Sequence, residues 1–221
     1  MDYKWIPNWN GINNSNNNGN NNNDNNNDNR ANSGWNSSWN NPWNMYNGGM
    51  GMMRPCPKCF FAMAQGIIVE LVPGRMGNNQ TNGCVIYATV EDENGNTVTF
   101  LITPSTFVVD WETLSVGDRC MFWYRVDAPA PLIYPPQFAA VVAAKVKNSR
   151  MIDVSFYNAA LVNAEQTLQL NMDGSVNLRT TNNQYFQGSP ANHSLVVIYE
   201  SSTRSIPAQT TPKKIFVLCD S

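Results

Sequence analysis

The strongest constraint on this chain is a run of asparagine near its start. Residues 13–30 read NNSNNNGNNNNDNNNDNR, and hardly any side chain in this run is apolar. Such a segment cannot bury enough apolar surface to offset the entropy lost on ordering it. The run therefore predicts a low-complexity arm over residues 1–53 that is disordered on its own, with folding confined to the rest of the chain.

This arm nevertheless contains five of the seven tryptophans of the chain: Trp5, Trp9, Trp35, Trp39 and Trp43. Asn-rich sequence with spaced aromatic residues is typical of segments that are disordered alone and prone to self-association. Two interpretations stay open. The arm is a plain solvated linker, or its tryptophans are anchors for grooves on a neighbouring subunit, with the asparagine run as a spacer of about 60 Å when extended.

Charge and hydropathy exclude several classes of partner. The formal net charge is -2, and Lys and Arg do not cluster, so the electrostatic footprint of a protein that binds duplex nucleic acid is missing. No apolar run is long enough for a transmembrane helix. The first residues, MDYKWIPNWNG, lack the apolar stretch of a Sec signal peptide. We therefore expect no duplex nucleic acid, no membrane span and synthesis in the cytoplasm.

From residue 64 onward the patterns are those of β-structure. Asn94 and Gly95 separate two apolar, β-branched runs, and Asp173 and Gly174 separate two more, which predicts two hairpins. Gly117 marks a turn before the strand MFWYR. No long segment has the period of a helix. We expect a Cys-containing hinge over 54–63, an OB-like β-barrel over 64–148 and a second β domain over 149–221.

Two features carry a resemblance to known proteins. The strand order, with LSVGD leading into a central strand, resembles an OB-fold, a five-stranded barrel. The segments containing YPPQ (128–142) and STRSIPAQTTP (202–219) resemble a group of OB-like β-proteins of spore-forming Firmicutes, mainly clostridia. Some of these also carry repeats similar to the N-terminal domain of copper amine oxidase. The resemblance covers residues 64–219 and implies a mainly β fold, an OB-like small barrel followed by a second small β unit. It supplies no catalytic residue.

The composition of the arm is similar to that of spore-coat and spore-appendage proteins. Those proteins are made in the mother cell and assemble there without a signal peptide. This similarity implies that the chain is laid down on the spore or cell surface.

Groups for catalysis are scarce. The single histidine, His193, lies in the loop SPANHSL with no nucleophile placed near it, so a surface or loop-packing role is the simpler interpretation. No paired carboxylates occupy strand positions suited to glycoside hydrolysis, and no Gly-rich phosphate loop stands between a strand and a helix. We expect no enzymatic activity, no cofactor and no metal.

The cysteines offer the sharpest local motif, PCPKC, with Cys56 and Cys59. Four interpretations stay open: half of a zinc site, a redox pair, a bond to a neighbouring chain, or plain thiols. Cys84 and Cys120 lie in apolar strands and are expected to behave as small buried hydrophobes. Cys219, near the end of the last strand, becomes a third candidate with Cys56 and Cys59 for cross-linking subunits.

The sequence thus favours a non-enzymatic structural protein that self-assembles as a filament or coat subunit, joined by the arm and the cysteines. The alternative is an OB-type binding module for single-stranded nucleic acid or a small ligand. The strand MFWYR bears on that alternative, because Phe122 and Tyr124 point to one face while Met121 and Trp123 point to the other. At least one pair must fill the expected barrel.

Overall fold

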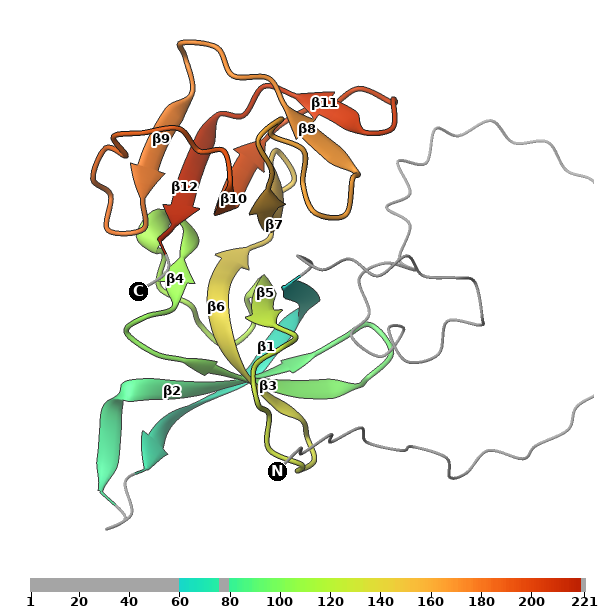
Figure 1. Cartoon of the computed structure of the whole chain (residues 1–221). Helices are drawn as coiled ribbons and strands as arrows, with labels where there is room; N and C mark the ends of the chain where they lie inside the picture. The colour runs from blue at the N-terminus through green and yellow to red at the C-terminus, as the bar shows by residue number, and fades with distance from the viewer. Residues whose placement is uncertain (1–59, 76–79, 220–221) are drawn as a thin grey trace, which may run out of the picture. The chain divides into compact units, whose positions relative to one another are not determined.

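The computed structural model describes residues 60–75 and 80–219 (Figure 1). By its internal contacts the chain divides into two units, 1–35 and 36–221, and the described residues all belong to the second. The predicted arm, with Trp5, Trp9, Trp35, Trp39 and Trp43, lies outside the described residues. Cys56 and Cys59 of the predicted hinge lie outside them too.

The first sheet has six strands in the order β3-β2-β1-β5-β6-β4, and β3 also pairs with β6 in parallel. Its elements are β1 (Phe61–Arg75), β2 (Thr81–Glu91), β3 (Thr97–Ile102), β4 (Phe107–Val108), β5 (Arg119–Arg125) and β6 (Gln137–Lys145). The short 3-10 helix η2 (Val109–Trp111) follows β4 directly. The sequence predicted strands at β1, β2, β3, β5 and β6, because each is a β-branched or aromatic run between turn residues.

The rest of the chain builds two further sheets. A four-stranded sheet has the order β7-β10-β12-β9, with β7 (Met151–Tyr157), β10 (His193–Tyr199), β12 (Lys214–Leu218) and β9 (Asn177–Thr180). A two-stranded sheet pairs β8 (Leu168–Leu170) with β11 (Ala208–Thr210). The pairs β9–β12 and β8–β11 are both parallel and join segments that are far apart in sequence.

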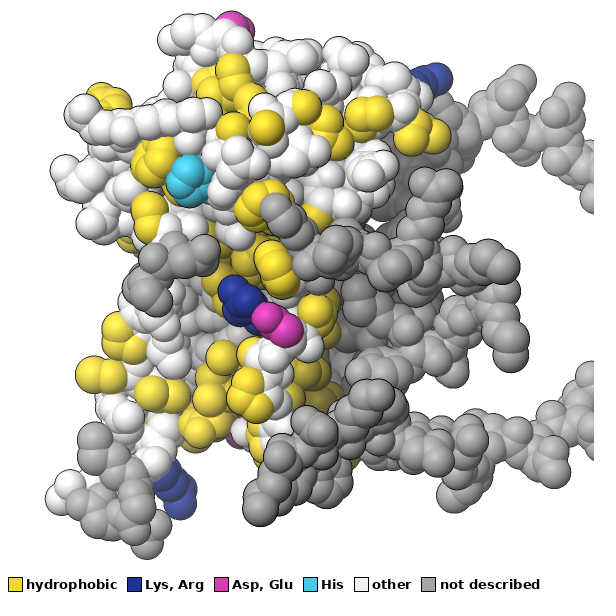
Figure 2. All heavy atoms as spheres, viewed as in Figure 1, with side chains coloured by type: hydrophobic (Ala, Val, Ile, Leu, Met, Phe, Trp, Pro, Cys, Tyr) yellow, Lys and Arg dark blue, Asp and Glu magenta, His cyan; other side chains and the backbone are white. Residues whose placement is uncertain are grey.

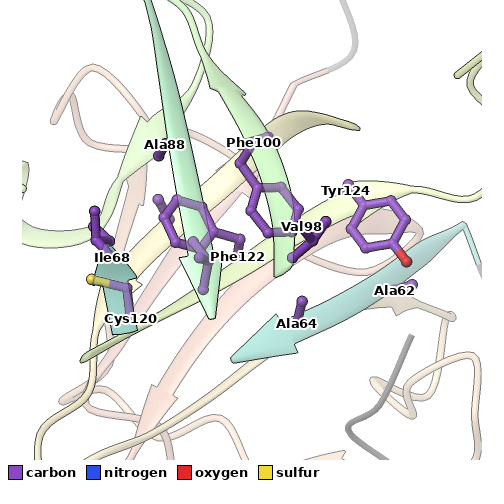
Figure 3. Packing of buried hydrophobic residues seen from close by; sticks show 12 residues of the cluster. Ala62, Ala64, Ile68, Ala88, Val98, Phe100, Cys120, Phe122 and Tyr124 are labelled. Atoms are coloured by element: carbon purple, nitrogen blue, oxygen red, sulfur yellow. The ribbon is translucent and has the colours of Figure 1, made fainter. Parts of the chain in front are cut away.

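Three apolar clusters hold these sheets. The first cluster lies within the first sheet, where Phe100 and Phe122 stack with ring centroids 4.6 Å apart (Figure 3). The second cluster joins the first sheet to the four-stranded sheet, through Trp123 and Val142 on one side and Val196 and Phe216 on the other. The third cluster lies between the four-stranded sheet and β8.

The predicted fold class is wrong in part. The protein is mainly β, as predicted, but an OB-like small barrel followed by a second small β unit is wrong. Within residues 60–75 and 80–219 the strands form three sheets, and the second cluster joins the first sheet to the four-stranded sheet, so the second β unit is not independent of the first. The two predicted units are not separate because both faces of β5 are covered: Phe122 and Tyr124 lie in the first cluster, while Trp123 and Met121 contribute to the second.

The turn predictions succeed in part. The turn at Asn94 and Gly95 is confirmed, with Gly95 at a φ of 79°, and Gly117 turns the chain before β5 at a φ of 92°. The hairpin at Asp173 and Gly174 is wrong. Strands β8 and β9 on its two sides do not pair with each other but take parallel partners in different sheets, β11 and β12.

Helical membrane spans are not found in the part of the chain that the structure describes.

Candidate interaction surface and binding recess

The β1–β2 hairpin extends past β5, and its tip also extends past β3 as a two-stranded ribbon. Strand β1 pairs with β5 only up to Ile67, and β2 pairs with β3 only from Ile86 onward. Residues 70–73 of β1 pair with residues 86–89 of β2, which pair in turn with β3, and at the tip Gly74 pairs with Asn82 and Arg75 with Thr81. We call residues 69–75 and 81–85 the outer ribbon; here β1 pairs with β2 alone among the described strands. Figure 1 shows this end of the hairpin projecting at the lower left. An isolated two-stranded ribbon is marginally stable in water, so contact with another surface would stabilise the tip at residues 74–75 and 81–85.

Apolar side chains on the outer ribbon and at its root are exposed. Val69 is 43% exposed and Val72 is 36% exposed, while Ile67 at the root is 47% exposed. The space-filling view shows hydrophobic side chains at the surface over the lower half, where the first sheet lies (Figure 2). Single exposed apolar residues are ordinary, but a run of them on one projecting hairpin is a candidate interaction surface.

The backbone edges of the outer ribbon are poorly suited to adding another strand. Pro73 removes a donor from the β1 edge. The register jumps from Ile86 opposite Pro73 to Asn82 opposite Gly74, which leaves three residues of β2 bulged. Prolines and bulges protect sheet edges from edge-to-edge pairing. Contact through side chains is therefore favoured here over a continuous intermolecular sheet.

The three described cysteines differ sharply in environment. Cys84 sits in the bulge and is exposed, contrary to the expected buried role, because the ribbon leaves the apolar cores before reaching it. Cys120 is buried as predicted, and burial raises the pKa of its thiol to about 12. Cys219 is exposed near the end of β12. Cys84 and Cys219 are thus open to chemistry with another chain.

A recess lies beside η2. It has a volume of about 440 Å³ and is lined by the loop 104–108, Trp111, Glu112, Thr181 and Asn182. Trp111 is 50% exposed. Its ring is fixed by edge contacts with Phe107, at a centroid distance of 5.9 Å, and Phe216, at 5.7 Å. The recess is thus built by β4 and η2 with the residues beside them, together with the loop after β9.

The backbone beside this recess is left-handed at two successive residues that are not glycine. Asp110 has a φ of 58° and Trp111 a φ of 53°. A bulky side chain in this region is an outlier that costs about 1–3 kcal/mol and persists only where the surroundings impose it. Such outliers cluster at functional sites.

Ion pairs hold this strained segment. The Asp110 carboxylate accepts hydrogen bonds from the Arg150 guanidinium at 2.5 Å and from the Lys214 ammonium at 3.0 Å. Burial alone would raise the pKa of Asp110, but the bonds and charges of Lys214 and Arg150 outweigh it and lower the pKa. Arg150 is almost fully buried and also donates to the Lys145 carbonyl. A buried pair of this kind fixes geometry more than it adds net stability.

A second buried polar group lies on β7. Tyr157 donates a hydrogen bond to the Asp153 carboxylate at 2.5 Å, and Ser155 donates one to Glu165 at 2.6 Å. Burial raises the pKa of Asp153 to about 6; the charge of Glu165 adds to the rise, and the Tyr157 hydrogen bond opposes it. The side chains of this group are paired with one another inside the fold, so we treat it as structural.

The remaining sequence candidates give no site. His193 is half-buried, its Nδ1 lies 2.8 Å from the Ala191 carbonyl oxygen, and its ring meets Phe186 edge-on. The aromatic residues of β5 are packed on both faces and offer no stacking platform. Within residues 60–75 and 80–219, no group of three or more His, Cys, Asp or Glu side chains could hold a metal ion.

Sequence reasoning missed the recess. Asp110 and Trp111 are adjacent in η2, but Arg150 and Thr181 come from other segments, and no Gly or Asn marks the left-handed residues of η2. The one available signal was Trp111 itself, a large aromatic residue between two acidic ones.

The chain matches no family model, and no curated protein matches it.

Proposed function

We propose that this is a non-enzymatic structural protein that assembles with further copies of itself, as a filament or coat subunit. The observation that supports this proposal best is the outer ribbon, which projects from the first sheet with exposed apolar side chains and an exposed thiol. A second copy is the partner that fits. The apolar ribbon would be covered by the same surface of a neighbour, and Cys84 would lie close to the joint.

The role proposed for the arm rests on sequence alone. Residues 1–53 would reach a neighbouring subunit, with their tryptophans as anchors and with Cys56, Cys59 and Cys219 as cross-links. An arm that becomes ordered on binding gives up entropy but can cover a large surface. Assembly on a spore or cell surface is proposed on the composition of this arm.

Electron microscopy of the full chain tests this function. Negative stain with and without reductant should show filaments or sheets, which shorten or disperse when disulfides are reduced. A chain lacking residues 1–53 should stay folded by circular dichroism yet fail to assemble. Dispersed monomers of the full chain under both conditions, over a wide range of concentration, would contradict the proposal. Assembly by the truncated chain would show that the arm is not needed, and would leave the outer ribbon as the proposed contact between copies.

A further inference from the structure

We propose that the recess beside Trp111 binds a neutral oligosaccharide. This would be a second function of the chain, independent of its assembly, and it rests on the shape, the side chains and the charge of the recess.

The aromatic part of the recess suits a sugar ring. Trp111 is half-exposed, yet its ring is clamped by Phe107 and Phe216, so little side-chain entropy is lost when a ligand covers it. The negative face of an aromatic ring attracts the weakly positive C–H groups on the flat side of a pyranose. Rigid, partly exposed tryptophan is therefore a natural platform for such a ring.

The polar part of the recess suits hydroxyl groups. The Thr181 hydroxyl makes no hydrogen bond with the described residues, and the Asn182 side chain uses only its oxygen, as acceptor for Thr180. Ser105 adds a hydroxyl that shares a bond with Thr103. These groups can each donate to or accept from a sugar hydroxyl without breaking the fold.

The charge of the recess argues against an anionic ligand. The one charged residue of its lining, Glu112, pairs with Lys147 at 2.8 Å and contacts Arg150. A nucleic acid would need cations along the path of its phosphates. Neither Lys nor Arg lines the recess as described, so a neutral ligand is favoured over a single-stranded nucleic acid.

The recess is also preorganised. Ligand pockets typically measure about 300–1,000 Å³ and are mostly formed before binding, and the volume here lies within that range. The left-handed backbone at Asp110 and Trp111, held by Arg150 and Lys214, fixes the tryptophan in its exposed position without a ligand. Strain maintained in this way is expected where it serves binding.

Titration calorimetry on the full-length protein tests the proposal, with cellohexaose, chitohexaose and a ten-residue oligothymidylate as probes. At least one oligosaccharide should bind saturably, and the oligothymidylate should not. W111A should weaken that binding at least about tenfold, the loss expected for one stacked aromatic residue. T181V, which removes the free hydroxyl, should weaken it a few-fold.

Two controls keep this test decisive. Y134A removes an aromatic side chain that is more exposed than Trp111 but lies outside the recess, and it should bind like the wild type. W111F keeps a ring and should bind better than W111A, which separates stacking from misfolding. Absence of saturable binding to both oligosaccharides would overturn the proposal. So would equal binding by W111A and Y134A, or salt-dependent binding of the oligothymidylate.

Discussion

The inner and outer halves of the β1–β2 hairpin are opposites. In the inner half, residues 61–67 of β1 pair with β5, and apolar clusters cover both faces of β1. In the outer ribbon, β1 pairs with β2 alone among the described strands, and Val69, Val72 and Cys84 are exposed. One hairpin thus contains a segment that is packed on both faces and a segment with exposed apolar side chains.

This difference separates the effect of strand pairing from the effect of apolar packing. Antiparallel hydrogen bonds are present in both halves, but only the inner half has a core on each side. The inner half should therefore set the stability of the fold, while the outer ribbon should set association. The first two predictions below compare a change in or against the inner half with a change in the outer ribbon.

The largest effect is expected in the first cluster. Phe122→Ala removes a fully buried ring that stacks on Phe100, and it should cost about 3–5 kcal/mol in the free energy of unfolding. Val72→Ala, on the outer ribbon, should change it by less than about 0.5 kcal/mol. Urea denaturation in reductant measures both. Similar costs for the two variants would mean that the ribbon is packed in the folded monomer.

Two glycines of the same hairpin give the next contrast. A Cβ at Gly66 would lie 2.2 Å from the Glu91 carbonyl oxygen, where the inner strands cross closely, whereas a Cβ at Gly83 would meet no atom within 4 Å. Gly66→Ala should therefore destabilise the protein by about 1–3 kcal/mol through overpacking. Gly83→Ala should be nearly neutral. Urea denaturation measures both variants. A Gly66→Ala variant as stable as the wild type would show that β1 and β2 separate easily at this point.

Burial also predicts a pH dependence in the four-stranded sheet. The pKa of Asp153 is raised to about 6 in the folded protein, from an ordinary value of 3.8. Its contribution to stability is thus complete below pH 3.8 and is lost as pH rises through about 6. The wild type should be about 1 kcal/mol more stable at pH 5 than at pH 7. Asp153→Asn should lose this difference, as measured by thermal denaturation at both pH values. If the variant kept this pH dependence, the difference in stability would come from a group other than Asp153.

Much of the strand pattern could be predicted from sequence. Alternating apolar runs and the turn glycines at 95 and 117 located most strands of the first sheet, because these signals are local. The parallel pairs β8–β11 and β9–β12 could not be predicted, since they depend on partners about 40 residues away. The double burial of β5 was equally hidden, because the sequence does not say what packs on an outer face.

The candidate sites divide in the same way. The exposure of Cys219 near a strand end was anticipated from its position, whereas that of Cys84 was not, because the ribbon looks like any apolar strand in sequence. The recess required Trp111, Arg150 and Thr181 to meet from three distant segments. Long-range assembly of that kind leaves no mark on a single sequence.

Sedimentation velocity on a variant of the outer ribbon tests the central claim most directly. Val69→Lys with Val72→Lys places two like charges on the exposed ribbon, and Leu132→Lys with Tyr134→Lys places them on apolar side chains that are more exposed but lie elsewhere. All three proteins should unfold at similar urea concentrations. The wild type and the second variant should sediment as large assemblies, and the ribbon variant as a monomer. Undiminished assembly of a folded ribbon variant would contradict the claim that this ribbon joins one copy to the next.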